Sequence, residues 1–133
     1  MSKEADLESL TYVCEPDDDG DVETIEYPEE LTRVLPDLIA KNKRVFLHAT
    51  AIGLVAYKRA SDIDYRAITA AKFGGKDIQL IDAQAKCGFT SVLWPSRQVF
   101  ASLCEDYPGI PVTIGILAWS EAQGDRRSAK KKP

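Results

Sequence analysis

The stretch Val45–Tyr57, VFLHATAIGLVAY, decides the fold class, because it is the most apolar region of the chain. Its β-branched and aromatic residues, with Gly53 near the middle, favour buried strands. We predict one strand over 44–49 and a second over 53–58. A helix across 51–58 is the alternative for the second half, since periodicity does not distinguish short buried strands from short buried helices.

A helix is predicted immediately before this stretch, over residues 28–42. Pro28 occupies a favoured first-turn position. The apolar residues of the segment have the i, i+3, i+4, i+7, i+8 spacing of one buried face: Leu31, Val34, Leu35, Leu38 and Ile39. Pro36 falls inside that pattern, so we expect a kink or two shorter helices. Before the helix, residues 22–26 alternate like a short strand.

After the apolar stretch the pattern continues to alternate. Ser61 and Asp64 have the spacing of a capping box, with aspartate in place of glutamate, and open a helix that runs to Phe73 and stops at Gly74-Gly75. The elements predicted beyond it are strands at 77–82 and 89–94, a helix at 96–106 and a strand at 110–118. The last strand rests on the alternation of apolar residues from Ile110 to Ala118.

Alternating helices and strands predict an α/β fold. We expect a single-domain sandwich with a mainly parallel or mixed sheet of about five strands flanked by three helices. The α/β domain is predicted to span residues 22–120. Residues 1–21 form an acidic, largely irregular arm in this interpretation, and residues 121–133 form a basic flexible tail.

The formal net charge of −4 hides two oppositely charged regions. Residues 1–30 hold twelve acidic residues and one basic residue, whereas residues 31–133 hold nine acidic and sixteen basic residues. Within the second region, 41–76 carries eight bases and two acids. A basic body next to an acidic arm predicts long-range attraction to an anionic partner. The competing interpretation is that both termini are solvated tails.

The cysteine and histidine content limits the chemistry. Cys14, Cys87 and Cys104 are widely spaced and odd in number, and His48 is the only histidine. This set predicts three free thiols in a reducing, cytoplasmic location, with no disulfide framework and no metal site. The chain has no phosphate-binding glycine motif, so we expect no cofactor. It has no apolar run long enough to span a bilayer, and the N-terminal residues do not resemble a secretion signal, so we expect no membrane partner.

Two predicted helix starts carry basic residues and point to anion binding. Lys58 and Arg59 precede the Ser61 helix, and Ser96 and Arg97 open the helix at 96–106. Unpaired N–H groups at helix N-termini attract phosphates and carboxylates. We therefore predict an anion-binding site that comprises Lys58, Arg59, Ser61, Ser96 and Arg97. The alternative is that the serines are only N-caps and the bases are solvated.

One catalytic arrangement is conceivable. His48 and Asp82 end predicted strands, and Cys87 follows in the next loop, so parallel pairing would bring the three side chains to one sheet edge. No nucleophile motif surrounds Cys87. A lone histidine in an apolar strand is usually a hydrogen-bonded core residue, so we assign no catalytic residue and expect a binding protein. The alternative is a small transferase or hydrolase at this edge.

A short segment resembles a known enzyme family. Gly74–Gln84, which contains the run Leu80-Ile81-Asp82-Ala83-Gln84, together with Ser96-Arg97 and Phe100, is similar to the C-terminal part of the leucyl/phenylalanyl-tRNA–protein transferases. The resemblance implies an acetyltransferase-like fold. Ala83 stands where the family has a cysteine, and the family's N-terminal domain has no counterpart, so we do not assign the chain to it.

The sequence therefore predicts a small cytoplasmic regulatory or adaptor module whose partner is anionic: an acidic protein surface, a nucleotide or a nucleic acid. A structural oligomer without ligand is the third hypothesis.

Trp94 and Trp119 lie at predicted strand ends, where they either pack within the domain or form a contact with a second copy. Packing within the domain is the favoured interpretation, because both faces of such a sheet are normally covered.

Overall fold

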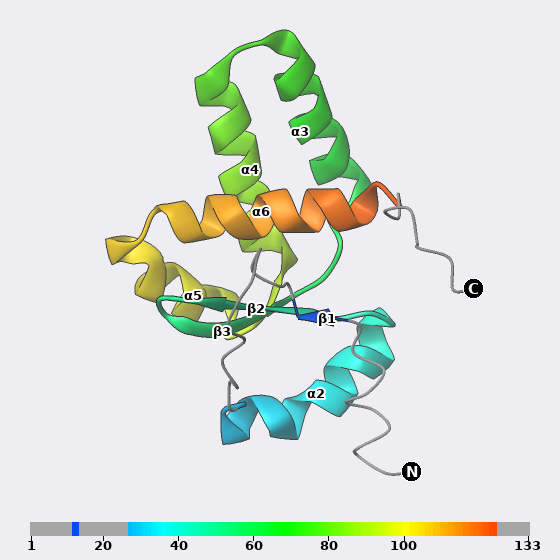
Figure 1. The fold of residues 1–133 in the computed structure, drawn as a ribbon, viewed down its shortest axis with the longest axis vertical. Coiled ribbons are helices and arrows are strands. Elements are labelled where there is room, and N and C mark those ends of the chain that lie inside the picture. The colour runs from blue at the N-terminus through cyan, green and yellow to red at the C-terminus, as the bar shows by residue number, and fades with distance from the viewer. Residues whose placement is uncertain (1–11, 14–26, 125–133) are drawn as a thin grey trace, which may run out of the picture.

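A small sheet separates two unequal groups of helices in the computed structural model (Figure 1). The structure describes residues 12–13 and 27–124. Its elements in chain order are β1 (Tyr12–Val13), α2 (Glu29–Asn42), β2 (Phe46–Thr50), β3 (Gly53–Tyr57), α3 (Asp62–Gly74), α4 (Asp77–Ser91), β4 (Val92–Trp94), α5 (Arg97–Leu103), the 3-10 turn η1 (Cys104–Asp106) and α6 (Gly109–Ala122).

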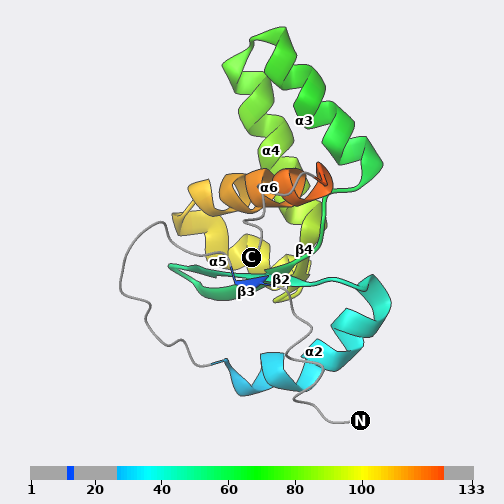
Figure 2. The same ribbon diagram turned by 45° about the vertical axis from the view of Figure 1, so that its right-hand side comes forward.

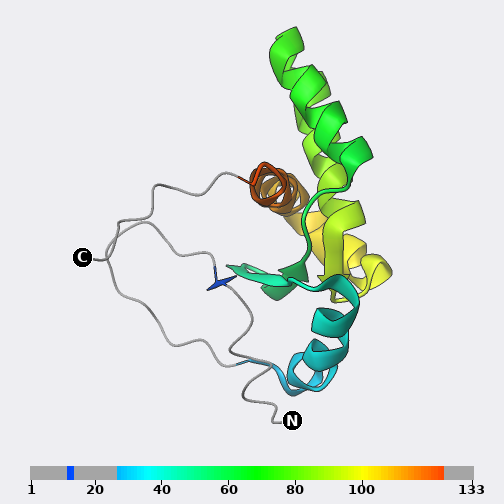
Figure 3. The same cartoon turned by 90° about the vertical axis from the view of Figure 1, so that its right-hand side faces the viewer.

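The helices form layers on the two faces of the sheet. Helix α2 covers one face, and α5 and α6 lie on the other (Figures 1 and 2). Helices α3 and α4 form a hairpin that projects beyond α6, and the view from the side shows the projection clearly (Figure 3). The sheet is therefore the middle layer of the body, and the hairpin extends away from it.

The predicted α/β sandwich with a mainly parallel or mixed sheet of five strands and three helices is wrong. The sheet order is β1-β2-β3-β4, and both β2–β3 and β3–β4 pair antiparallel. Only the two-residue β1 runs parallel to its neighbour, β2. Five α-helices account for most of the described residues. The predicted strands at 77–82 and 110–118 are helical, which removes the parallel strands that the sandwich required.

The error at 110–118 has a simple cause. Nearly every residue from Ile110 to Trp119 is apolar. Such a run fits the two-residue period of a strand and the 3.6-residue period of a helix equally well, so the sequence pattern does not distinguish them. The burial shows the true period: Pro111, Ile114, Gly115 and Ala118 are buried at i, i+3, i+4 and i+7, which is the spacing of one helix face. Pro111 stands in the first turn, where a proline removes no intrahelical hydrogen bond.

The segment at 77–82 is helical for a different reason. Two of its three large apolar residues lie outside the core, because Ile78 is 74% exposed and Ile81 is 50% exposed, and only Leu80 packs against the larger core. The buried part of α4 begins further along, where Cys87, Gly88 and Ser91 face the interior. The apolar run at the start of this helix therefore lies on the projecting hairpin, where it imitated the pattern of a buried strand.

Two hydrophobic cores lie on opposite faces of the sheet. Alternate residues of β3 divide between them, with Val55 and Tyr57 on the α6 side and Leu54 and Ala56 on the α2 side. The larger core adds Phe100 and the inner faces of α3, α4 and α6. The smaller core joins the sheet to Leu31 and Leu35 of α2, together with Val45 and Leu47.

Some of the other predicted elements are confirmed. Helix α2 is one continuous helix with Pro36 inside it, so two separate helices are excluded. The strands predicted at 44–49 and 53–58 are β2 and β3, which excludes the helix across 51–58. Only the end of the strand at 89–94 is extended, as β4. The strand at 22–26, most of the arm and most of the tail lie outside the described residues.

None of the helices that the structure describes combines the length and apolar character that crossing a membrane requires. Cys87 and Cys104 are buried free thiols, and Cys14 lies outside the described residues.

Candidate functional site

A depression of about 210 Å³ collects four cationic side chains at one end of the sheet. The side chains that line it are Asn42, Lys43, Arg44, Lys58 and Arg59. We call it the cationic depression. Its residues come from two segments, the turn after α2 and the segment that leaves β3.

The antiparallel register brings these two segments together. Phe46 at the start of β2 pairs with Tyr57 at the end of β3. The residues before Phe46 therefore lie beside the residues after Tyr57, which places Arg44 near Arg59. The N–H of Lys58 also donates to the carbonyl oxygen of Ser91 at 3.0 Å, which fixes the segment against the end of α4.

The turn after α2 holds a lysine in a costly conformation. Lys43 has φ 65° and ψ −46°, and the N–H of Arg44 donates to the carbonyl oxygen of Asn42 at 2.6 Å. This three-residue γ-turn is rare and strained, and a positive φ at a residue with a side chain costs about 1–3 kcal/mol. The chain accepts that cost at the turn that places Lys43 and Arg44 in the depression.

The charges of the cationic depression are not neutralised within the described part of the chain. No acidic side chain from the residues that the structure describes lines it. The two ion pairs in the described residues join Arg33 to Glu29 and Arg66 to Asp62, both within single exposed helices. The four cations therefore have no carboxylate partner among the residues that the structure describes.

A second depression, of about 310 Å³, adjoins the first and shares Lys58 with it. Its lining residues are Lys58, Ser61, Ile63, Asp64, Lys86, Thr90 and Ser91. We call it the mixed depression, because it combines two cations with a carboxylate and hydroxyl groups. Helices α3 and α4 supply most of its walls.

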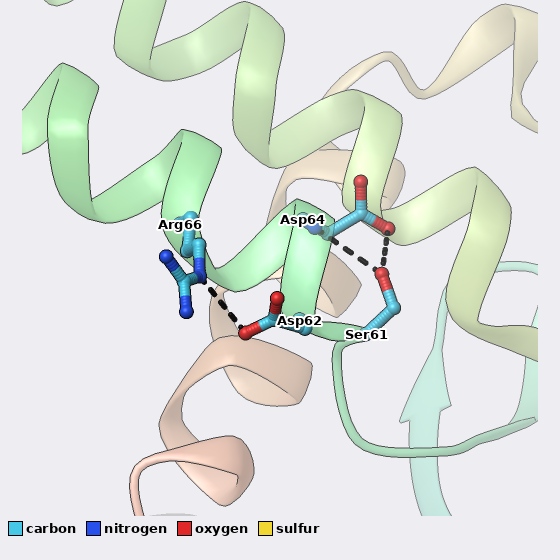
Figure 4. A network of polar contacts seen from close by, with 4 residues as sticks. All are labelled: Ser61, Asp62, Asp64 and Arg66. Carbon is cyan, nitrogen blue, oxygen red and sulfur yellow. Dashed lines mark hydrogen bonds and ion pairs between the residues drawn. The ribbon is translucent and has the colours of Figure 1, made fainter.

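Asp64 is the most buried charged side chain in the described residues, at 6% exposure. Its N–H donates to Ser61 Oγ at 3.2 Å, and the Ser61 hydroxyl donates back to Asp64 Oδ2 at 3.3 Å (Figure 4). The Thr90 hydroxyl of α4 donates to the same Oδ2 at 2.5 Å. The predicted capping interaction between Ser61 and Asp64 is confirmed, and it also joins the start of α3 to α4.

The predicted anion-binding residues divide into two groups in the structure. Lys58 and Arg59 line the cationic depression, and Lys58 and Ser61 line the mixed one. Ser96 and Arg97 line neither depression. Ser96 Oγ accepts from the N–H of Val99 at 3.3 Å and caps α5. Arg97 Nε donates to the carbonyl oxygen of Phe89 at 3.0 Å, near the C-terminal end of α4.

The structure does not bring His48, Asp82 and Cys87 to one sheet edge. Asp82 lies on α4, so the strand that was expected to end there does not exist. Cys87 is buried with its Sγ 3.6 Å from Ser91 Oγ. Burial raises the pKa of the Cys87 thiol, opposed by the Ser91 hydrogen bond and reinforced by the charge of Asp64. A thiol with a raised pKa is a poor nucleophile near neutral pH.

His48 itself differs from the expected hydrogen-bonded core residue. It is half-buried in β2, and its Nδ1 has no hydrogen-bond partner in the described part of the chain. Burial lowers the pKa of the imidazole below its usual value of 6.5. The side chain therefore favours the neutral form in the folded protein.

Both tryptophans pack within the domain, as the sequence favoured. Trp94 contacts the smaller core, on the α2 side. Trp119 stacks on Tyr65 with ring centroids 5.8 Å apart, and its Nε1–H donates to Thr69 Oγ1 at 3.0 Å. These contacts attach α3 to α6, and Lys72 Nζ lies 4.8 Å from the centre of the Trp119 ring.

Sequence reasoning missed Lys43, Arg44, Lys86 and Asp64 as members of a site. The first two had a usable signal, because residues 38–61 contain five lysines or arginines and no acidic residue. Lys86 and Asp64 had none, since only the packing of α3 against α4 places them together.

Three comparisons with known proteins add no relative, since no family model, no curated protein and no solved structure matches the chain. The segment that resembles the leucyl/phenylalanyl-tRNA–protein transferases thus gains no support from a family model, and its predicted strand is part of α4.

Proposed function

We propose that the chain is a small cytoplasmic module, regulatory or adaptor in role, that binds an anionic partner through the cationic depression. The observation that supports the proposal is that four cations line one depression without a carboxylate partner in the described residues. Like charges held together repel one another, and a bound anion relieves that repulsion. The free thiols Cys87 and Cys104 are compatible with a reducing compartment.

The side chains of the depression suit binding better than catalysis. Arginine and lysine donate charge-assisted hydrogen bonds to phosphate and carboxylate oxygens, and the arginine fork is the stronger of the two. Among the described residues, the lining contains no histidine, cysteine or carboxylate that would serve as base or nucleophile. The proposed role is therefore recognition of anionic oxygen atoms, which nucleotides, nucleic acids and acidic protein surfaces share.

The test compares two double variants with the same change in net charge. Arg44→Ala with Arg59→Ala removes two cations of the depression. The control, Arg33→Ala with Arg66→Ala, removes two exposed arginines whose partners lie on their own helices. Affinities for pyrophosphate, short oligonucleotides and acidic peptides are measured by calorimetry at two salt concentrations.

We expect the depression variant to lose about a hundredfold in affinity, because each charge-assisted hydrogen bond contributes about 1.5–3 kcal/mol. The control is expected to lose only the small part that added salt screens. Equal losses in the two variants would show that the depression is no binding site. Failure of every probe to bind the wild-type protein would contradict the proposed function itself.

A further inference from the structure

The two depressions share Lys58 but differ in the ligand groups that they accept. The cationic depression presents four cations and the Asn42 amide. The mixed depression presents Lys58 and Lys86 together with the Asp64 carboxylate and three hydroxyl groups. A ligand that occupies both must therefore carry different groups at its two ends.

Asp64 has one oxygen in use and one available. Oδ2 accepts a hydrogen bond from Ser61 (Figure 4) and another from Thr90. Oδ1 has no hydrogen-bond partner in the described part of the chain. Ser61 and Thr90 come from the capping position of α3 and from α4, so they hold the carboxylate in a fixed orientation. Asp64 thus presents an oriented acceptor to the mixed depression that it lines.

The charges around Asp64 select a neutral donor. An anionic group would be repelled by the carboxylate, and it would bind more favourably beside the four cations of the neighbouring depression. An ammonium group would be repelled by Lys58 and Lys86, which line the same depression. A hydroxyl group avoids both penalties, because it is uncharged and donates a hydrogen bond to a carboxylate oxygen.

The cationic depression selects the other end of the ligand. Four cations favour a doubly charged group with several acceptor oxygens over a single carboxylate. The four cations lie together in a depression of about 210 Å³, so the attraction is local and suits a compact anion better than a long polyanion. A phosphate monoester is the compact dianion that matches this depression.

We infer, on the basis of the proposed function, that the ligand is a phosphate monoester whose organic part carries hydroxyl groups, such as a sugar phosphate. Its phosphate occupies the cationic depression, and one of its hydroxyl groups donates to Asp64 Oδ1 in the mixed depression. Lys58, which lines both depressions, lies at the junction between the two ends of the ligand.

The first experiment needs only the wild-type protein. Dissociation constants are measured by calorimetry for inorganic phosphate, ribose 5-phosphate and n-pentyl phosphate, which carries five carbons and no hydroxyl group. We expect ribose 5-phosphate to bind about tenfold more tightly than pentyl phosphate, because only the sugar donates to the carboxylate. An oligouridylate of equal phosphate concentration is the polymer control, and we expect it to bind more weakly than ribose 5-phosphate.

The second experiment uses Asp64→Asn, with Asp62→Asn as the matched control. Asp62 is an exposed carboxylate of the same helix turn, and its partner is Arg66. Asp64→Asn is expected to remove most of the preference for ribose 5-phosphate while the affinity for pentyl phosphate stays within about threefold, and Asp62→Asn is expected to retain the preference.

The outcomes separate the two proposals. Equal affinity of the wild type for ribose 5-phosphate and pentyl phosphate would overturn the sugar-phosphate inference and leave anion binding intact. Tighter binding of the oligouridylate would overturn it in favour of a nucleic acid. Absence of binding by all phosphates would overturn the sugar-phosphate inference, and the proposed function would fall with it only if the acidic peptides also failed to bind. If Asp64→Asn does not fold, the wild-type comparison alone decides.

Discussion

Gly115 of α6 lies against the main chain of Gln84 in α4, so closely that a Cβ atom on Gly115 would overlap the Gln84 carbonyl oxygen. The contact is reciprocated one turn away, where a Cβ on Gly88 of α4 would overlap the carbonyl of Pro111 in α6. The two helices therefore cross with their backbones in direct contact. This crossing fixes the base of the α3–α4 hairpin, and through α4 it fixes Thr90 and the wall of the mixed depression.

Gly115→Ala is expected to lower the free energy of unfolding by about 1–3 kcal/mol, because the backbones must separate to admit the methyl group. The matched control is Gly109→Ala in the same helix, where no described residue comes within 4 Å of the added Cβ. We expect the free energy of unfolding of the control to lie within about 0.5 kcal/mol of the wild-type value. Chemical denaturation followed by circular dichroism measures both variants. An unchanged free energy of unfolding in Gly115→Ala would contradict the close crossing.

The sequence could predict the helices that have local signals, but not those that depend on tertiary contacts. Helix α3 was predictable because its signals are local: a Ser61 cap, an Asp64 contact three residues later and a left-handed Gly75 at the end. Helix α6 was not, because its apolar residues allow either period, and burial alone chooses between them. The close approach that demands Gly115 is a tertiary contact, which has no signature in the residues around it.

The candidate site divides in the same way. Lys58 and Arg59 were identified as anion ligands because they are adjacent basic residues before a helix cap. Lys43 and Arg44 join them only through the antiparallel pairing of β2 with β3, which the sequence analysis did not predict. Arg97 was grouped with them by analogy between two helix starts, although neither Ser96 nor Arg97 lines either depression.

Ser61→Ala is expected to lower the free energy of unfolding by about 1–2 kcal/mol. The variant removes the side-chain cap of α3 and one hydrogen bond to the buried Asp64 carboxylate. Ser102→Ala on the exposed face of α5 is the control, since alanine is favoured within a helix. Thermal unfolding compares the two variants. A Ser61→Ala protein as stable as the control would mean that the cap contributes nothing.

His48 predicts a pH-dependent stability whose sign follows from its surroundings. Burial lowers the pKa of the folded imidazole below the usual value of 6.5, which applies to the unfolded chain. As the pH falls through about 6.5, the unfolded chain therefore takes up a proton before the folded chain does, and the protein loses stability. Above about pH 7.5 both states are neutral and the contribution is constant.

The variant His48→Gln cannot titrate, so the loss of stability between about pH 7.5 and 5.5 should be smaller in the variant than in the wild type. The measurement is the free energy of unfolding in urea at both pH values. Affinity for ribose 5-phosphate should stay unchanged, because His48 lines neither depression. Identical pH dependence in the two proteins would show that His48 titrates alike in the folded and unfolded chain.

Replacing Arg97 is expected to lower the stability of the protein, whereas replacing Arg59 is expected to lower its affinity for anions. Arg97 Nε donates to the Phe89 carbonyl near the end of α4, where carbonyl groups lack intrahelical partners, so Arg97→Ala should lower the free energy of unfolding by about 0.5–1 kcal/mol. Arg59 is exposed and lines the cationic depression, so Arg59→Ala should leave the free energy of unfolding within about 0.5 kcal/mol of wild type and weaken anion binding about tenfold.

The test measures the free energy of unfolding in urea and the anion affinity by calorimetric titration for each of the two variants. A loss of anion affinity in Arg97→Ala as large as in Arg59→Ala would return Arg97 to the binding site and place that site closer to α5. Unchanged stability in Arg97→Ala would show instead that water replaces the guanidinium at the Phe89 carbonyl without cost.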